Sequence, residues 1–462
     1  MNPLVGLGQD DEGAYAVTRD VRSHALIVGT TGSGKFSCQF AHTVAACKHA
    51  SLIYIDPKDA AGAIRGAIPR SRVGPVHILD PFDLCKGYRK AAFNPLDRLA
   101  PSNPDAISEA RQLAAAICVP SGTGGSAKFF DSSARNALVP ILLHVAGAPS
   151  EKGRSTLKRV RQLLLEVAAE LMGGDERPLV RRIIAEDAYG GIVAEQLTSL
   201  LSMNERTLGD VIASITQHMG LLDIPAYDGV LNRTTFRFED LAHQVGTVFI
   251  TCGARHMEDA TSWLRLLTTS AINRIMAANG TVPVILMIDE ATTLGQLAPI
   301  KVALDMGRSA GIFVNAACQS LAQLEDVWGR AGYQALMSGF GSKILLGCGD
   351  MFTAQAISEL LGQQTIRTKS ESTNRGTRSG SQGETESWIG RPLLTPAEVM
   401  SFDRQQLLWL RTGGDPAKLW KFHYFENKAL LAQMTPELQR DAPIWVRPTL
   451  APTHRRIGGA KP

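Results

Sequence analysis

The sequence predicts an α/β protein in which a mostly parallel sheet, flanked by helices, is interrupted by an all-helical insert. Short apolar runs alternate with helical patterns before residue 97 and again after about residue 245. Such alternation is typical of a parallel sheet that is covered on both faces. Residues 98 to 215 show helical patterns without convincing strands. In addition, a glycine-rich turn follows the first strand, as it does in phosphate-binding folds.

The expected strands are short apolar runs, several of which end in acidic or turn residues. They are 24–28, 51–55, 76–79, 247–250, 283–288, 311–317 and 343–346. Beyond the helix expected at 38–47, the clearest helical patterns are 104–118, 132–146, 155–172 and 194–201. We therefore expect a nucleotide-binding domain from 1–97 and 216–440, an all-α domain at 98–215 and a flexible basic tail at 441–462.

Length and composition indicate an ordinary globular protein. At 462 residues with 44% hydrophobic content, the chain can bury the cores of two or three domains. The net charge of +4 is too small to indicate nucleic-acid binding by itself. Seven cysteines without C-x-x-C spacing read as reduced core thiols, which excludes a disulfide framework or a zinc site of that pattern. No apolar run has the length of a membrane span, so the sequence predicts no transmembrane segment in this chain.

The strongest chemical motif is a phosphate-binding loop between the first strand and the first helix. It consists of Gly29, Thr30, Thr31, Gly32, Ser33, Gly34, Lys35 and Phe36. Backbone N–H groups around Gly32 and Gly34 would wrap the phosphates, and the helix N-terminus would add its partial positive charge. Lys35 would reach the β and γ oxygens. The pattern predicts a nucleoside triphosphate site, against the alternative of a glycine-rich turn that binds nothing.

Phe36 departs from this motif. The usual residue at this position is Ser or Thr, whose hydroxyl ligates Mg²⁺. Ser37 lies about 100° further around the helix and cannot take over that ligand position. Phosphate binding survives the substitution, whereas the Mg²⁺ geometry and the rate of hydrolysis are put in question.

A second motif is the apolar strand 284–288, which ends in Asp289 and Glu290. Successive strand residues point to opposite sides, so at the strand's end one carboxylate can hold a metal while the next faces the attacking water. We expect Asp289 to be the Mg²⁺ ligand and Glu290 the general base. Acids also mark ordinary strand exits, so the interpretation depends on the combination with Lys35.

Two further positions leave alternatives open. Gln319 follows the strand 311–317 and could contact the γ-phosphate and report its loss, or it could cap the helix at 321–328. Asp56 and Lys58 follow the strand 51–55. They could orient metal or phosphate, or they could form a turn with a solvated lysine.

Several segments, in this order along the chain, resemble the type IV secretion coupling proteins, the TraG/TraD-like conjugation ATPases. The central signature of that family is similar to 289–297, 307–312 and 319–324. Flanking segments that also resemble the family are 56–58, 79–83, 93–97, 128–135, 356–362 and 391–399. The resemblance extends from about residue 24 to residue 426.

This resemblance implies a RecA-like ATPase that uses ATP and Mg²⁺ and works as a hexameric ring with nucleotide at the subunit interfaces. It implies a cargo of relaxase-bound single-stranded DNA or of protein effectors, recruited through the all-α domain. The partners would be the secretion channel ATPase and inner-membrane components, at the cytoplasmic face of the bacterial inner membrane. Arg308 becomes the candidate arginine finger for a neighbour's γ-phosphate, against the alternative of a surface arginine ahead of a strand.

The chain departs from most of the family in one more respect. Most members carry an N-terminal membrane anchor, whereas barely two dozen polar residues precede the first strand here. Either this member lacks the anchor or the anchor has been removed. In the first case we expect a monomer in isolation and a hexamer when active. The contrasting hypotheses are a nucleotide-binding receptor with little hydrolysis and a translocase of double-stranded DNA.

Direct sequence support for nucleic-acid contact is modest. Arg154, Lys158, Arg159 and Arg161 form a basic patch that could equally be a solvated helix face. We expect 366–390 to be a long polar loop, either lining a pore or forming a surface excursion.

Overall fold

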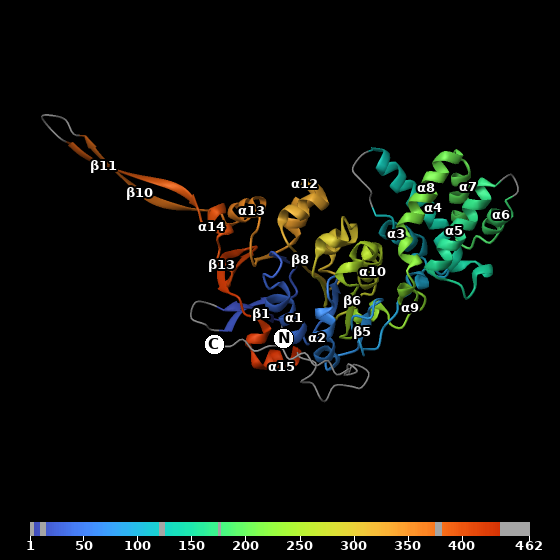
Figure 1. The fold of residues 1–462 in the computed structure, drawn as a ribbon, viewed down its shortest axis with the longest axis horizontal. Helices are drawn as coiled ribbons and strands as arrows, with labels where there is room; N and C mark the ends of the chain where they lie inside the picture. Colours follow the sequence, from blue (N-terminus) through green and yellow to red (C-terminus); the bar gives the residue numbers. More distant parts are fainter. Residues whose placement is uncertain (1–3, 10–14, 120–124, 174–176, 375–380, 435–462) are drawn as a thin grey trace.

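The computed structural model describes residues 4–9, 15–119, 125–173, 177–374 and 381–434, and these residues build one large sheet with helices on both faces (Figure 1). The tail predicted at 441–462 lies outside them. The strands of the sheet are β1 Leu4–Gln9, β2 Tyr15–Asp20, β3 Ala25–Val28, β4 Ser51–Asp56, β5 Val76–Leu79, β6 Thr247–Thr251, β7 Val284–Ile288, β8 Ile312–Cys318, β9 Ser342–Leu345, β12 Gln406–Arg411 and β13 Gly414–Trp420.

The strand order is β2-β1-β13-β12-β9-β3-β8-β7-β4-β6-β5. From β9 to β5 all neighbours are parallel, while β12, β13, β1 and β2 extend the sheet as antiparallel strands. The predicted α/β class with a mostly parallel sheet is therefore confirmed. The predicted strands correspond to β3–β9, whereas the antiparallel extension was not predicted.

Side chains of the central strands alternate between two apolar layers, as the pleat requires. Ile27, Tyr54 and Met287 face the layer that contains α1 Ala41–Ala46 and α2 Ala61–Ser71. Leu26 and Leu286 face the opposite layer. That layer contains α10 Met257–Ala277, α11 Ala298–Met306 and α12 Leu321–Gly339. Packing on both faces thus fixes the position and the direction of each strand end that carries a site residue.

The helical insert lies at one end of the molecule, in the cyan and green part of Figure 1. Its helices are α3 Ala106–Ile117, α4 Gly125–Gly147, α5 Leu157–Met172, α6 Pro178–Ala185, α7 Ile192–Leu201 and α8 Glu205–His218. Local side chains begin some of them: Thr156 accepts from Arg159 N and Asn204 accepts from Thr207 N. The insert enters after β5 and leaves before β6, two neighbouring strands. The domain boundaries at residues 98 and 215 remain predictions.

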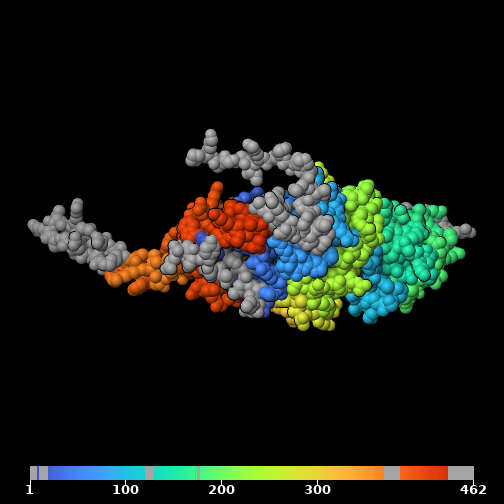
Figure 2. Space-filling view, turned by 90° about the horizontal axis from the view of Figure 1, so that it is seen from below, coloured from blue at the N-terminus to red at the C-terminus, as the bar shows by residue number. Residues whose placement is uncertain are grey.

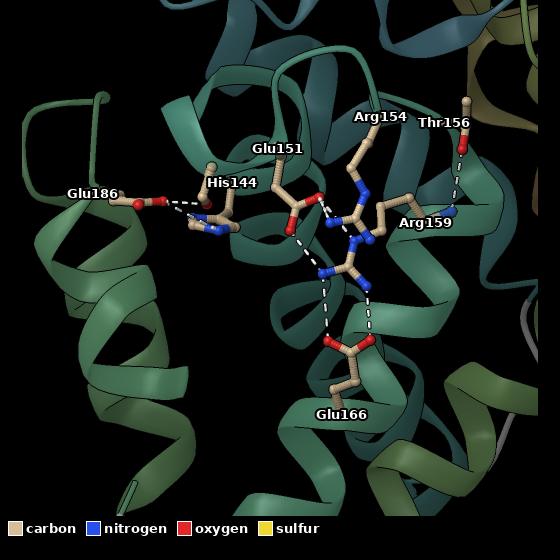
Figure 3. Close-up of polar contacts among 8 residues, drawn as sticks. His144, Glu151, Arg154, Thr156, Arg159, Glu166 and Glu186 are labelled. Atoms are coloured by element: carbon tan, nitrogen blue, oxygen red, sulfur yellow. Dashed lines mark hydrogen bonds and ion pairs between the residues drawn. The ribbon is translucent and has the colours of Figure 1, made fainter. Parts of the chain in front are cut away.

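The basic patch predicted in the helical domain is paired with acids, and Figure 3 shows this for Arg154 and Arg159. Arg159 donates from Nε and Nη2 to the buried Glu151, at 2.8 and 2.7 Å, and its Nη1 lies 2.7 Å from Glu166 Oε1. The other three cations also have acidic partners, in the pairs Arg154–Glu151, Lys158–Asp228 and Arg161–Asp223. Of the two open interpretations, a free cationic surface for DNA is therefore not supported.

The prediction of a polar loop at 366–390 is wrong for its described residues. They lie in a two-stranded antiparallel ribbon of β10 Gln363–Asn374 and β11 Ser381–Pro392, which projects from the body opposite the helical insert (Figures 1 and 2). Ile366 stands opposite Ile389, and the Thr368 and Ser387 hydroxyls lie 2.8 Å apart. The described Trp388 and Ile389 are exposed, and the mostly polar sequence of the two strands lacks the apolar alternation by which strands are recognised.

Four α-helices remain among the described residues. A short helix, α9 Asp228–Leu231, precedes β6. The others are α13 Met351–Leu361, α14 Pro396–Met400 and α15 Lys428–Met434, and α15 packs against α1 and α2. In Figure 2 these red C-terminal residues lie against the blue N-terminal part of the core. Within the described residues, none of the helices combines the length and the apolar character needed to cross a bilayer.

Candidate active site

The glycine-rich loop connects β3 to a helical turn, Lys35–Phe40, that continues into α1. Gly32 and Gly34 have φ angles of 78° and 95°, in the left-handed region that favours glycine. A Cβ on Gly34 would meet Cys38 Sγ at 2.8 Å, whereas one on Gly32 would meet no atom within 4 Å. The loop is therefore a backbone cradle with an open outer side, which fits a phosphate chain.

Lys35 lies beneath this loop and is 7% exposed. Its Nζ donates to Gly29 O at 2.6 Å. Burial, followed by the nearby Lys58 ammonium, lowers the pKa of Lys35, and the carboxylates of Glu290 and Asp289 oppose this effect. Lys35, the predicted phosphate lysine, thus interacts electrostatically with the predicted acids Asp289 and Glu290.

Asp289 follows β7 and is held against β4. Its N–H donates to Ile55 O at 3.0 Å, and the Tyr54 hydroxyl donates to Asp289 Oδ2 at 3.3 Å. Burial raises the pKa of Asp289 to about 7, and Asp56 adds to this, while Lys58 and Lys35 limit it. A metal cation that displaced the proton would relieve this penalty, so the carboxylate suits a Mg²⁺ ligand.

Glu290 is 5% exposed and has three side-chain partners. Its Oε2 accepts from Gln319 Nε2 at 3.3 Å and pairs with Lys58 Nζ at 3.0 Å, and its Oε1 accepts from Thr292 Oγ1 at 2.9 Å. Gln319 therefore faces the acid pair. Ser320 caps α12 instead, because its hydroxyl accepts from Gln323 N at 3.2 Å, so the capping alternative for Gln319 is wrong.

Asp56 and Lys58 combine the two roles left open by the sequence. Asp56 organises a turn, since its carboxylate accepts the backbone N–H groups of Lys58, Asp59 and Gly62 at 3.1, 3.4 and 3.2 Å. Lys58, however, is only partly solvated, and its ammonium pairs with Glu290. The turn thus carries a charged group into the site.

Phe36 packs away from the polar groups. Its ring stacks on Tyr54, with centroids 6.5 Å apart and planes 5° apart, and it meets the edge of Tyr424 at 6.1 Å. The position that usually supplies a hydroxyl is therefore part of an aromatic cluster. Tyr54 links this cluster to Asp289 through its own hydroxyl.

The C-terminal segment forms one wall of the site, which the sequence did not reveal. Lys421 Nζ donates to Ser33 O at 3.0 Å, and His423 Nδ1 lies 2.8 Å from Ser37 Oγ. A cavity of about 390 Å³ beside the loop is lined by loop residues together with Arg404, Lys421 and His423. These contacts join residues nearly 400 positions apart, so no local pattern indicates them.

Arg308 is the one predicted site residue that the structure does not bring to Lys35. It lies between α11 and β8, at the opposite edge of the parallel sheet. There it borders a cavity of about 780 Å³ together with Arg19, Arg411, Asp20 and Asp305. Burial, and then the charge of Arg308, lower the pKa of His24 to about 4.

A central strand, a glycine-rich loop and acids at the ends of neighbouring parallel strands define a RecA-like P-loop nucleotide-binding fold. Solved structures agree: the plasmid coupling protein TrwB in complex with ADP and Mg²⁺ matches with a TM-score of 0.65 at 18% identity, over 90% of this chain and 89% of that one. The VirB4 structure from Thermoanaerobacter pseudethanolicus matches with a TM-score of 0.52 at 14% identity, over 92% and 97%.

The chain belongs to the family described as type IV secretory system conjugative DNA transfer, whose profile matches residues 4–442. It is similar to the conjugal transfer protein TraG of Rhizobium radiobacter, at 25% identity over 89% of this chain and 63% of that protein. It is also similar to the coupling protein VirD4 of Bartonella henselae, at 25% identity over 82% and 60%. The chain thus spans about three-fifths of the length of these curated relatives.

Proposed function

We propose that this chain is a coupling ATPase of a type IV secretion or conjugation system. The observation that carries the proposal is the convergence of Lys35, Asp289, Glu290 and Gln319 at one edge of the sheet, in a chain of this family. Relatives are named as coupling proteins, and TrwB has been solved with ADP and Mg²⁺ and with ATP and GTP analogues. We propose ATP and Mg²⁺ as the cofactors here.

Each residue then has a defined task. The backbone N–H groups from Gly29 to Phe36, with Lys35, hold the triphosphate. Asp289 holds Mg²⁺, which when bound neutralises charge that develops on the phosphates. Glu290 accepts a proton from the attacking water, and Gln319 couples the state of the γ-phosphate to α12.

The position of Arg308 supports a ring. Because it lies at the sheet edge opposite the phosphate loop, it cannot serve the nucleotide of its own chain, but a head-to-tail neighbour would present it to the next site. We propose a hexamer in the active state, with relaxase-bound single-stranded DNA or protein effectors as cargo. Recruitment by the helical insert, action at the cytoplasmic face of the inner membrane, and contact with the channel ATPase and inner-membrane components complete this proposal.

Phe36 favours a second candidate, a receptor that binds nucleotide without useful hydrolysis, because the site has no hydroxyl at the usual Mg²⁺ position. Steady-state ATPase activity with and without single-stranded DNA separates the two. A coupling ATPase shows turnover that Glu290→Gln abolishes while nucleotide still binds. A wild type without turnover, indistinguishable from Glu290→Gln, excludes the ATPase and leaves the receptor.

A pull-down distinguishes the cargoes. The full chain is immobilised with ATP and offered a relaxase–DNA complex or an effector protein from the same cell. Deleting 98–215 removes the surface that we propose for recruitment, and capture that persists without it contradicts this assignment.

A further inference from the structure

Glu290 is restrained by three partners in this arrangement. An ionised carboxylate oxygen offers about two lone-pair positions, and Oε2 already contacts Lys58 Nζ and Gln319 Nε2. Oε1 accepts from Thr292. Of these three partners, only Lys58 brings a full charge, and its electrostatic attraction is the strongest restraint on the carboxylate.

The backbone of Lys58 is anchored by hydrogen bonds, whereas its ammonium is held by one ion pair. Its N–H donates to Asp56 Oδ1, and its carbonyl accepts from Ala254 N at 2.6 Å. The carbonyl of the preceding Pro57 accepts from the Cys252 thiol. The side chain itself is 32% exposed and makes one ion pair. Because the backbone of Lys58 is fixed and its side chain is a flexible four-carbon chain, the ammonium can exchange partners without a change in the fold.

The surrounding charges favour such an exchange. Burial lowers the pKa of Lys58, but the carboxylates of Asp289 and Glu290 raise it by more, so the amino group stays protonated. Lys35 shares the same acids from the loop side. A triphosphate in the loop would add more negative charge than Glu290 carries, within reach of the same two ammonium groups.

We propose that Lys58 is a positioning residue that holds Glu290 in an ion pair, and that a bound triphosphate weakens this pair by attracting the ammonium but leaves it formed in part of the filled sites. This inference rests on the proposed ATPase function. The pair acts as a latch: it restrains the general base fully in the empty site and partly in the filled site, so it limits turnover even at saturating nucleotide. The reaction itself is unchanged, since the proton of the attacking water still passes to Glu290.

The test is steady-state ATPase activity of the full chain, without cargo, for the variant Lys58→Met. This side chain keeps the length and the apolar stem but has no charge. Freeing Glu290 raises kcat about threefold to tenfold with KM unchanged. Lys58→Arg restores an ion pair and returns kcat to the wild-type value. In a Glu290→Gln background, Lys58→Met has no effect on turnover.

Lys90→Met is the matched control, because Lys90 forms a surface ion pair with Asp83 outside the site. It removes the same charge and leaves kcat unchanged. Lys58→Gln, which retains a hydrogen-bond donor, serves if Lys58→Met does not fold.

Three outcomes overturn the latch. They are a fall in kcat, an unchanged kcat, and a rise in KM, which would make Lys58 a direct phosphate ligand. Failure of the proposed function looks different. In that case wild type and all Lys58 variants bind nucleotide with equal Kd and turn over at no measurable rate, or they do not bind nucleotide at all.

Discussion

Two buried glutamates, Glu151 and Glu290, each pair with a cation, but the two pairs differ in geometry and in solvent exposure. Glu151 is held by the two-pronged guanidinium of Arg159, only eight positions away, and both side chains are almost inaccessible (Figure 3). Glu290 is held by a single ammonium from a strand end 232 positions away, and the side chain of that lysine is 32% exposed. One pair closes a local network, and the other joins distant segments at one point.

The difference follows from the chemistry of the two cations. A guanidinium fork fixes both oxygens of its partner, and breaking it leaves a buried charge without compensation. An ammonium group contacts a single oxygen of its partner here, and its N–H donors can turn to a new acceptor. We therefore expect the first pair to affect stability alone and the second to affect activity alone.

The largest effect that sharpens this contrast is on turnover. Glu290→Gln lowers kcat by about 10² to 10⁴-fold, because the amide accepts no proton from water. The free energy of unfolding changes by less than about 1 kcal/mol, since the Lys58 ammonium remains partly hydrated. ATPase assays and urea unfolding of the same preparation check both numbers. A large loss of stability would remove the distinction between the two glutamates.

Glu151→Ala reverses the pattern. Arg159 is left buried without its main partner, and the protein loses about 3 to 5 kcal/mol of unfolding free energy. ATPase activity per folded molecule stays at the wild-type value. Chemical denaturation followed by circular dichroism, with Glu195→Ala on α7 as an exposed control, measures the loss. A loss of less than about 1 kcal/mol contradicts the interpretation of the network as a structural lock.

The pH dependence of stability has opposite signs at the two places. Despite burial, hydrogen bonds and charge from Arg159 lower the pKa of Glu151, so its contribution to stability is present at neutral pH and is lost as pH falls through its folded pKa. Burial raises the pKa of Asp289 to about 7, so ionising it in the nucleotide-free protein costs stability as pH rises toward neutrality.

Unfolding at several pH values therefore distinguishes the variants. Asp289→Asn stabilises the nucleotide-free protein at pH 8 by about 1 kcal/mol or more beyond its effect at pH 5. Glu151→Gln destabilises it almost equally at pH 8 and pH 5, and the loss shrinks only as the pH falls below the ordinary glutamate pKa of 4.5. Equal effects of Asp289→Asn at pH 5 and pH 8, or an undiminished effect of Glu151→Gln at about pH 3, would contradict the described pKa shifts.

The smallest expected effect concerns Phe36. Phe36→Ser restores the usual hydroxyl and raises Mg²⁺-dependent turnover several-fold, but it opens the cluster with Tyr54 and Tyr424 and costs about 1 to 3 kcal/mol of stability. Activity measured against Mg²⁺ concentration, together with the melting temperature, checks the two changes. Phe36→Ala is the control, since it opens the same space without a hydroxyl and leaves turnover low.

Sequence reasoning succeeded where a pattern is local. The apolar runs that became β3–β9 alternate with helices in the expected way, and the spacing of Gly29, Gly34 and Lys35 placed a strand, a turn and a helix correctly. The ends of parallel strands meet at one sheet edge, so the proximity of Lys35, Glu290 and Gln319 also followed from the motif order.

What could not be predicted depends on pairings across hundreds of residues. Three contacts arise from the strand order, which no local pattern encodes. They are the Lys58–Glu290 ion pair, the stacking of Phe36 on Tyr54, and the contacts of Lys421 and His423 with the loop. The β10–β11 ribbon was missed because the sequences of its two strands are mostly polar. The placement of Arg308 at the far edge required the direction of β8 in space.

The pairing of the first strand with the last has a consequence for synthesis. A ribosome releases β1 and the phosphate loop about 400 residues before β13, which pairs with β1, and before Lys421, which binds Ser33. Until then the sheet has an unpaired edge beside β9, and the loop lacks one wall. A nascent chain therefore depends on the segment 406–423 to complete the nucleotide pocket, and termination near residue 400 leaves the edge of β9 without its partner strand.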